Sequence, residues 1–353
     1  MEISTPGRVC LFGEHQDYLG LPVLAMSISL RSKISGVHRN DSMVIIHKPD
    51  IGEIERFNLK NIKYESSRDY LKSGLNVCKR FGLRFSKGFE CEIISNIPIK
   101  AGTSSSSSIL VSWINFLNQI ADNPMDLKKE KIAELAYEAE VIEFNSPGGM
   151  MDQYSTALGG LIYLESNPKI AVRKLTKDLG AFVLGDSMEQ KDTIGILSRC
   201  RDDRLSILKK MRTVNNKADF NTVSLDQLDI YDLNDDEIKL IQGTIKNRDL
   251  LNLAMREIVK PELDKKLFGS LLNKHHFILK NTLKVSTPKI ELMLKSAIEA
   301  GAYGGKINGS GGGGCMFAYC PQNPEEVKEA IEGVGGKAYI VYSSDGTKIN
   351  SRT

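Results

Sequence analysis

The chain has 353 residues, longer than a typical single domain of roughly 100–200 residues, so we expect two domains that share one site. Apolar residues make up 41% of the chain and charged residues 26%, a balance that excludes a disordered or fibrous protein. The 47 basic and 44 acidic side chains leave a net charge of +3, which argues against nucleic acid or a membrane surface as the main partner. We find neither a membrane-spanning run nor a signal peptide, and therefore expect a cytoplasmic protein.

Hydrophobic periodicity predicts a mixture of helices and strands. Over residues 89–93, apolar side chains alternate with acidic ones, as in a half-buried strand. A helix is expected to begin after Thr287, which is followed by proline, and to end near Gly301. The other expected elements are helices over residues 110–121, 132–139 and within 209–260, and strands over residues 180–186, 314–320 and 337–342.

A domain boundary is expected near residues 165–175. Two adjacent glycines and an Asn-Pro turn lie at or just before this segment. The sequence contains no internal repeat, and no other glycine- or proline-rich segment is long enough to be a linker. Nothing therefore indicates another division. We therefore predict an N-terminal domain over residues 1–170 and a C-terminal domain over residues 171–353.

Six cysteines are scattered along the chain, without a Cys-x-x-Cys pair or the spacing of metal ligands. In a protein without an export signal, such cysteines are expected to be reduced thiols, several of them small core residues. This pattern predicts neither a zinc site nor a disulfide framework among Cys10, Cys78, Cys91, Cys200, Cys315 and Cys320.

A run of serines lies between a predicted strand and a predicted helix. Gly102 and Thr103 are followed by five serines, and the helix is expected to begin at about Ser108. A glycine and small hydroxyl residues at such a turn expose backbone N–H groups beside a helix N-terminus, which favours an anion such as phosphate. By composition alone, a flexible serine-rich loop is the alternative. The direct continuation into an apolar helix favours the phosphate site.

A second glycine-rich stretch, KINGSGGGG, occupies residues 306–314 and contains the spacing Gly-x-Gly-x-x-Gly from Gly309 to Gly314. A dinucleotide-binding fold requires a helix after this pattern, whereas residues 315–319 are strand-like. A Walker loop is also excluded, because residues 300–307 lack both its first glycine and its Ser or Thr. A loop that approaches a ligand closely and a plain turn both remain open.

Two carboxylates have unusual positions. Glu140 lies eight residues after Ile132 on the apolar face of a predicted helix, where a carboxylate is costly unless it is paired or bound to a metal. Asp152 lies among apolar residues after a Pro-Gly turn, where backbone capping is the ordinary role of a single aspartate. Neither residue identifies a function alone.

Together and in this order, these stretches resemble the galactokinase, homoserine kinase, mevalonate kinase and phosphomevalonate kinase (GHMP) superfamily, and within it the galactokinase-like sugar kinases. Residues 6–18, PGRVCLFGEHQDY, resemble the galactokinase signature, and residues 98–108 resemble the phosphate loop. Glu140 and Asp152 have the galactokinase spacing, which is one residue longer than in mevalonate kinases. Asn273, His276 and the glycine stretch complete the pattern.

The resemblance implies an α+β, two-domain GHMP kinase fold. Its N-terminal α/β domain would be ribosomal-protein-S5-like, its C-terminal domain ferredoxin-like, and the active site would lie in the cleft between them. Asp152 would accept the proton of the acceptor hydroxyl, with Arg8 beside it. Ser106 and Glu140 would lie near Mg²⁺.

The same resemblance implies binding roles for three further groups. ATP phosphates would contact Gly102, Thr103, Ser104, Ser105, Ser106, Ser107 and Ser108. The substrate would contact Glu14, His15, Asp17, Tyr18, Gly149 and Asp152. A glycine loop of Gly309, Ser310, Gly311, Gly312 and Gly313 would lie near the reaction site.

The implied function is an ATP-dependent sugar kinase that phosphorylates the anomeric hydroxyl of a monosaccharide, acting as a monomer or homodimer. Departures from the galactokinase pattern, at Leu19 and Thr103 among others, leave the sugar open among galactose, uronic acids, other aldoses, deoxysugars and heptoses. A mevalonate-type kinase of a small alcohol and a non-catalytic sensor of sugar and ATP are the alternatives.

Overall fold

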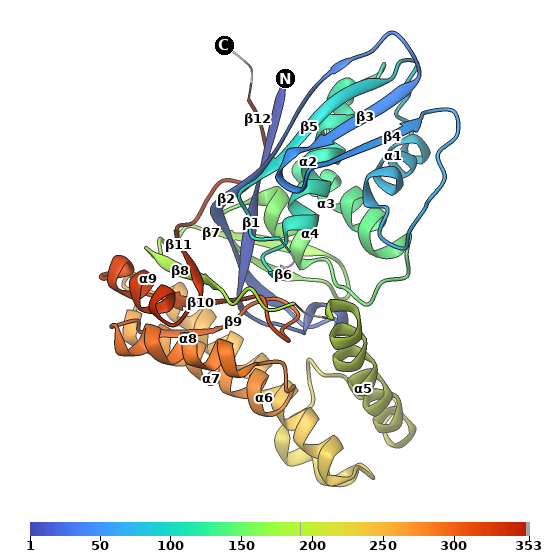
Figure 1. The fold of residues 1–353 in the computed structure, drawn as a ribbon. Helices are drawn as coiled ribbons and strands as arrows, with labels where there is room; N and C mark the ends of the chain where they lie inside the picture. Colours follow the sequence, from blue (N-terminus) through green and yellow to red (C-terminus); the bar gives the residue numbers. More distant parts are fainter. Residues whose placement is uncertain (100, 191, 351–353) are drawn as a thin grey trace.

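Two β-sheets organise the chain (Figure 1), and the computed structural model describes residues 1–99, 101–190 and 192–350. The first sheet has the strand order β12-β1-β2-β5-β3-β4, with β6 and β7 added beside β2. Its neighbouring strands are antiparallel except for the parallel pair β3 and β5. The strands are β1 (Glu2–Phe12), β2 (Val23–His38), β3 (Met43–Lys48), β4 (Glu53–Asn58), β5 (Phe89–Ser95), β6 (Leu161–Glu165), β7 (Ala171–Leu175) and β12 (Lys348–Asn350).

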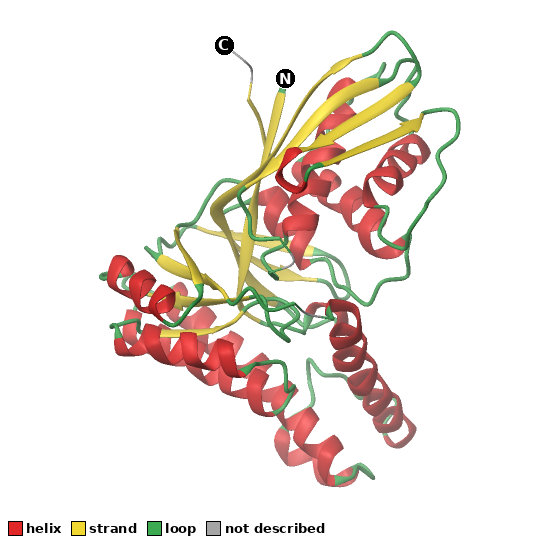
Figure 2. Cartoon of the chain, in the orientation of Figure 1, coloured by secondary structure: helices red, strands yellow, loops and turns green. Residues whose placement is uncertain are grey.

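Helices of the N-terminal half lie beside this sheet (Figure 2), and α2 and α4 contact its strands. They are α1 (Tyr70–Phe81), α2 (Ser105–Ile120), α3 (Lys129–Tyr137), a π-helix (Glu138–Ile142) and α4 (Met151–Leu158). Helix α2 contacts β1 and β2 and is buried on nearly every side, as expected of a central core helix. The rings of Trp113, Phe89 and Phe116 pack together between α2 and β5. The serine run at the start of α2 is thereby fixed to the core.

The second sheet has the order β11-β8-β10-β9, with every neighbouring pair antiparallel. This is the strand order of a ferredoxin-like domain, which confirms that prediction. The strands are β8 (Phe182–Asp186), β9 (Gly304–Ile307), β10 (Cys315–Tyr319) and β11 (Lys337–Val341). The helices of this half are α5 (Thr193–Val214), α6 (Asp235–Ile258), α7 (Lys265–Asn281), α8 (Pro288–Glu299) and α9 (Pro324–Gly333).

One apolar cluster joins the two halves. It contains Val9, Leu11 and Phe12 of β1 together with Phe268 of α7 and Phe317 of β10. The ring of Phe12 lies 5.5 Å from that of Phe268 in an edge-to-face contact. Because β1 belongs to this shared core, residues at its C-terminal end are held against both sheets.

The predicted division between residues 170 and 171 requires a correction. Strand β7 pairs with β6 in the first sheet, so the division falls inside a β-hairpin. Strand β12, near the end of the described chain, also returns to the first sheet and pairs with β1 (Figure 1). Backbone pairing between segments far apart in sequence leaves no signal in composition, so the sequence could not reveal this return.

Two further predicted helices are confirmed with small shifts of boundary. Thr287 accepts a hydrogen bond from the backbone of Ile290 and caps α8, as its sequence indicated. Helix α2 begins at Ser105 rather than near Ser108. All six cysteines are buried, and no disulfide joins any two of them. No helix in the described ranges is both long enough and apolar enough to cross a bilayer.

Candidate active site

A cavity of about 720 Å³ opens where the two halves of the chain meet. Its walls include the end of β1, the start of α2, the start of α4, the first turn of α5 and the glycine stretch. We call this cavity the cleft. Many of the sequence-predicted site residues line it, namely Arg8, Glu14, His15, Asp17, Tyr18, Gly102, Ser104, Ser105, Ser106, Ser107, Glu140, Gly149, Asp152, Gly309 and Ser310.

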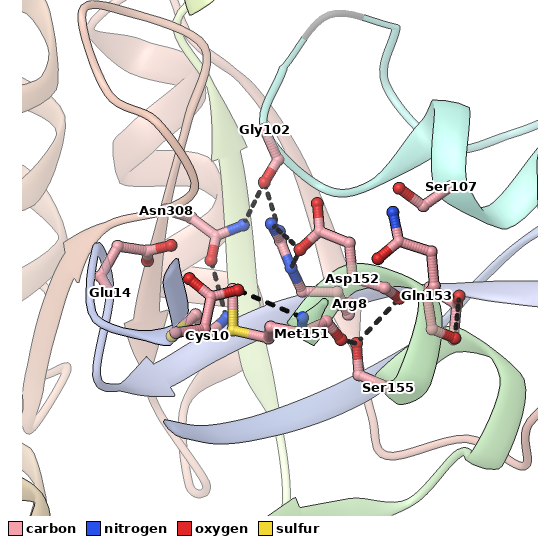
Figure 3. Close-up of polar contacts among 12 residues, drawn as sticks. Arg8, Cys10, Glu14, Gly102, Ser107, Met151, Asp152, Gln153, Ser155 and Asn308 are labelled. Atoms are coloured by element: carbon pink, nitrogen blue, oxygen red, sulfur yellow. Dashed lines mark hydrogen bonds and ion pairs between the residues drawn. The ribbon is translucent and has the colours of Figure 1, made fainter. Parts of the chain in front are cut away.

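Arg8 and Asp152 form an ion pair in the cleft (Figure 3). Arg8 Nη2 lies 2.7 Å from Asp152 Oδ1, and Nε donates to the same oxygen at 2.9 Å. Burial opposes the charge on Arg8, but Asp152 and Glu14 outweigh it and raise its pKa. The side chain of Asp152 is 31% exposed, so the carboxylate remains accessible from the cleft. In the described part of the chain, no residue hydrogen-bonds Oδ2 of Asp152.

The carbonyl of Gly102 connects this pair to the second half of the molecule. Gly102 O accepts from Arg8 Nη1 at 2.5 Å and from Asn308 Nδ2 at 2.8 Å (Figure 3). Asn308 Oδ1 in turn accepts from the backbone N–H of Cys10 at 2.9 Å. The serine loop, β1 and the glycine stretch are therefore tied together at the position of Arg8.

The serine loop (residues 102–108) and Glu140 form one polar cluster. Glu140 Oε1 accepts from Ser106 Oγ, and Oε2 accepts from Ser107 Oγ and Gln153 Nε2, all at 2.7 Å. The backbone N–H groups in the first turn of α2 lack intrahelical partners, as at any helix start. The predicted phosphate cradle thus has free backbone donors, serine hydroxyls and a carboxylate in one place.

Glu140 is chemically suited to a divalent cation. It is only 8% exposed, and burial raises the pKa of its carboxyl, yet no ion pair in the described ranges involves it. A carboxylate and a hydroxyl are the oxygen ligands that Mg²⁺ prefers. No group of three or more acidic, histidine or cysteine side chains in the described chain is arranged to hold a metal ion, so phosphate and water would complete the coordination. Glu140 and Ser106 therefore fit the predicted metal site.

The glycine stretch packs closely against residues 101 and 102 because Gly309 and Gly314 carry no side chain. A Cβ on Gly309 would lie 2.6 Å from the carbonyl oxygen of Gly102, and one on Gly314 would lie 2.6 Å from that of Ala101. Both glycines have positive φ, +77° and +72°. The backbone N–H of Cys315 donates to Ala101 O at 2.6 Å. The sequence left open whether this stretch is a ligand-binding loop or a plain turn. The structure favours a loop that contributes to the cleft.

Glu14, predicted to contact the substrate, is paired with a lysine of the second half. Lys306 Nζ on β9 lies 2.6 Å from Glu14 Oε2 and donates to the carbonyl of Cys10 at 2.9 Å. Both side chains are almost completely buried. The pair fixes one oxygen of Glu14.

His15 has both ring nitrogens occupied. Nε2 lies 3.1 Å from the carbonyl of Ser310, and Nδ1 lies 2.7 Å from the hydroxyl of Tyr18. Burial, assisted by the nearby charge of Arg204, lowers the pKa of His15 to about 3, so the ring is neutral. His15 therefore lines the cleft without a free nitrogen for a substrate hydroxyl, which differs from the direct contact predicted for it.

Asp17 and Gly149 lie against each other. Asp17 Oδ2 accepts from the backbone N–H of Met151 at 3.2 Å, at the start of α4, and Oδ1 accepts from that of Tyr18 at 3.0 Å. A Cβ on Gly149 would lie 2.0 Å from the Asp17 carboxylate, so a side chain at this position would displace it. Burial and the charge of Asp152 raise the pKa of Asp17 to about 6.

Sequence reasoning missed four residues that support the site: Gln153, Arg204, Lys306 and Asn308. Lys306 and Asn308 were considered only as neighbours of a glycine pattern. Their partners Glu14 and Cys10 lie more than 290 residues away in sequence, so no local pattern could connect them. Arg204 lies outside the helices and strands expected from the sequence, and the charged segment around it gives no sign of a buried side chain.

Three family models match the chain. "GHMP kinases N terminal domain" matches residues 69–160, "GHMP kinases C terminal" matches residues 254–339, and "Galactokinase galactose-binding signature" matches residues 2–34.

The similar proteins include both mevalonate kinases and galactokinases. A mevalonate kinase of Thermococcus gammatolerans is 26% identical, with 98% of this chain and 97% of that protein covered. A galactokinase of Clostridium acetobutylicum is also 26% identical, with 98% and 93% covered. Among solved structures, Lactococcus lactis galactokinase complexed with galactose aligns with a TM-score of 0.86, at 22% identity over 98% of this chain and 94% of that chain. Methanococcus jannaschii mevalonate kinase aligns with a TM-score of 0.75, at 21% identity over 98% of both chains.

The likeness in fold agrees with the predicted two-domain architecture, and the matching models cover both halves of the chain. The signature model matches the segment that contains Arg8, Glu14 and Asp17. The chain belongs to the GHMP kinase superfamily and lies in its galactokinase-like branch.

Proposed function

We propose that the protein transfers the γ-phosphate of ATP to the anomeric hydroxyl of a monosaccharide and so forms a sugar 1-phosphate. The proposal is carried by one observation: Arg8 contacts both Asp152 and the carbonyl of Gly102, so the acid that would meet the acceptor is fixed to the phosphate loop. The match of residues 2–34 to the galactose-binding signature supports a sugar as the acceptor.

In this proposal, the accessible oxygen of Asp152 orients the acceptor hydroxyl and takes its proton as the new O–P bond forms. A carboxylate is a weak base, and the greater part of its effect would be alignment of the nucleophile. Phosphoryl transfer depends mainly on such positioning and on electrostatic stabilisation.

Arg8 would act on the transferring group. Its guanidinium is fixed by Asp152 and Gly102 before any substrate binds, so it needs little reorganisation to stabilise charge on the phosphoryl oxygens. The serine loop would hold the ATP phosphates through backbone N–H groups and hydroxyls. Mg²⁺ held by Glu140 and Ser106 would neutralise phosphate charge.

The test is a coupled ADP-release assay with Mg²⁺ and ATP over a panel of acceptors. The panel contains galactose, glucose, mannose, fucose, arabinose, galacturonate, glucuronate, N-acetylhexosamines and heptoses, with mevalonate included. Turnover with one sugar, and its loss in Asp152→Asn, is the expected result. Phosphate on any position other than C1, located by NMR of the product, would contradict the anomeric assignment.

A mevalonate-type kinase is the second candidate, because proteins named mevalonate kinase are 26% identical to the chain over nearly its full length. Turnover with mevalonate alone would establish this candidate. ATP and sugar binding measured by calorimetry, without turnover on any acceptor, would instead indicate the non-catalytic sensor.

A further inference from the structure

Arg204 is a buried cation directly behind the wall of the cleft. It lies on α5, seven residues after Leu197, and residues at this spacing share a helix face. Leu197 and Thr193 line the cleft, and α5 begins at the junction between the two halves of the molecule (Figure 1). The side chain of Arg204 is 0% exposed. Its guanidinium carbon lies 5.5 Å from the centre of the Tyr18 ring, which itself lines the cleft.

The charge of Arg204 has no opposite charge in contact with it. Nε donates to the carbonyl of Cys200 at 2.6 Å, and Nη2 donates to the hydroxyl of Tyr18 at 2.7 Å. Nη1 is buried without a hydrogen-bond partner, and no ion pair in the described ranges involves Arg204. A buried charge left in this state is costly, by several kcal/mol in general. A ligand that brings an anion to this position would remove that cost.

The hydrogen bonds around Arg204 show that its neighbours Tyr18 and His15 carry no charge. The Ser310 carbonyl can only accept, so His15 Nε2 carries the proton and the neutral ring accepts at Nδ1. Tyr18 must then donate its proton to His15, and its oxygen accepts from Arg204. His15 and Tyr18 are neutral in this chain of bonds, so they leave the positive charge of Arg204 uncompensated.

Two of the three carboxylates at this end of the cleft are already paired with a cation. Asp152 pairs with Arg8, and Glu14 pairs with Lys306. Asp17 accepts the Met151 N–H at the start of α4, where the helix dipole favours a negative charge. None of them contacts Arg204, so no carboxylate in the described part of the chain compensates its charge directly.

We propose that Arg204 selects an acceptor that carries a carboxylate, so that the substrate is a sugar acid such as a uronic acid rather than a neutral sugar. The acceptor would place its carboxylate against Tyr18, close to the charge of Arg204, which is buried behind the lining of the cleft. This inference rests on the proposed sugar kinase function and specifies its substrate class. A site whose buried polar group needs a partner discriminates strongly against analogues that lack it.

The first test compares matched pairs of acceptors on the wild-type protein: galacturonate with galactose, and glucuronate with glucose. We expect kcat/KM to be at least about 100-fold higher for one of the acids than for its neutral partner, which is the size that loss of a charged hydrogen bond gives. Equal values, or a preference for the neutral sugar, would overturn the inference and leave the sugar kinase function intact.

The second test changes the charge. Arg204→Met should lower the acid-to-neutral ratio of kcat/KM by about 100-fold, and Arg204→Lys should give an intermediate ratio because an ammonium cannot replace the planar fork. Arg201→Met is the control, since Arg201 lies on the same helix and already pairs with Asp202 at 2.8 Å. A purely structural Arg204 would lower turnover with both acceptors equally, and the ratio would not change.

Measurements of sugar binding distinguish failure of this inference from failure of the proposed function. Calorimetry on the wild-type protein should show galacturonate or glucuronate binding more tightly than galactose or glucose, whether or not turnover occurs and whether or not Arg204→Met folds. Turnover with mevalonate alone, lost in Arg204→Met, would retain the carboxylate requirement but reject the sugar. Binding of neutral sugars alone would reject the role of Arg204.

Discussion

Glu140 and Asp152 reach the same cleft from neighbouring elements, but their surroundings differ. Glu140 is enclosed by two serine hydroxyls and an amide, and no cation pairs with it in the described chain. Asp152 is partly exposed and pairs with Arg8. The first arrangement leaves a negative charge in need of a cation, whereas the second leaves a fixed carboxylate open to the acceptor.

The difference shows how the environment of a carboxylate determines its chemistry. A group surrounded by neutral donors and short of positive charge suits a metal ion. A group whose charge is already balanced has no need of a metal, and can orient a hydroxyl. The comparison predicts that substitutions at the two positions will affect different measurements.

The largest effect is expected for Asp152→Asn. Loss of the proton acceptor should lower kcat by about 10³-fold or more, because positioned acid–base groups contribute roughly 10²–10⁴-fold. ATP affinity, measured by calorimetry, should remain close to that of the wild type. Glu65→Gln is a suitable control, since Glu65 is an exposed acid that lines the same cleft. Near-normal kcat in Asp152→Asn would reject the assignment.

Glu140→Gln should change the requirement for Mg²⁺ instead. The amide keeps one oxygen for the serines but loses the charge, so half-maximal activity should need at least about tenfold more Mg²⁺. The free energy of unfolding should not fall, because burial already disfavours the ionised form of Glu140. An unchanged Mg²⁺ dependence, or a tenfold shift in Asp152→Asn as well, would remove the distinction between the two carboxylates.

The glycine stretch offers a third test, because it holds the serine loop above Glu140. Gly314→Ala places a Cβ 2.6 Å from the Ala101 carbonyl at a φ of +72°, and should lower the free energy of unfolding by about 2–3 kcal/mol. Gly160→Ala is a matched control, since Gly160 has the same φ of +72° with no atom within 4 Å of its Cβ. It should cost only about 1 kcal/mol, through backbone strain alone.

The contact between Gly314 and the Ala101 carbonyl also predicts an effect on nucleotide binding. Displacement of Ala101 moves the first residues of the serine loop, so Gly314→Ala should raise KM for ATP whereas Gly160→Ala should not. Equal losses of stability in the two variants, measured by urea unfolding, would show that the contact with Ala101 has no energetic importance.

The sequence predicted local features of this site well. Apolar periodicity placed Glu140 on a buried face, and the turn residues placed the serine loop at the start of a helix. The π-helical turn that carries Glu140 could not be predicted, because an α-helix has the same apolar pattern. Spacing alone also could not show that Asp152 pairs with Arg8, although the family resemblance did.

Contacts between the two halves of the molecule could not be predicted from the sequence. Lys306 approaches Glu14 only because β9 and β1 meet across the shared core, and such a meeting depends on the whole fold. The same is true of Arg204, whose burial follows from the position of α5 rather than from the polar composition of that helix. Local patterns and the family resemblance together therefore predicted many of the residues that line the cleft, while the residues that support them needed the structure.

The smallest expected effect concerns Asp17, a third carboxylate whose surroundings lie between the other two. Its folded pKa of about 6 exceeds the ordinary value of about 3.9, so the folded state holds more protons than the unfolded state between these values. Stability contributed by this proton is present below about pH 4 and is lost as the pH rises through 6. Ionised Asp17 therefore destabilises the fold at pH 7.

Asp17→Asn lacks this titration, and its effect should depend on pH accordingly. The unfolding free energy of the variant minus that of the wild type should rise by on the order of 1 kcal/mol between pH 4 and pH 7, less than the full pKa shift implies because Asp17 is partly exposed. Urea unfolding at several pH values measures this difference, in which other titrating groups cancel. A difference that is constant with pH would mean that the Met151 and Tyr18 N–H groups compensate the charge completely, and Asp17 would then resemble Asp152 rather than Glu140.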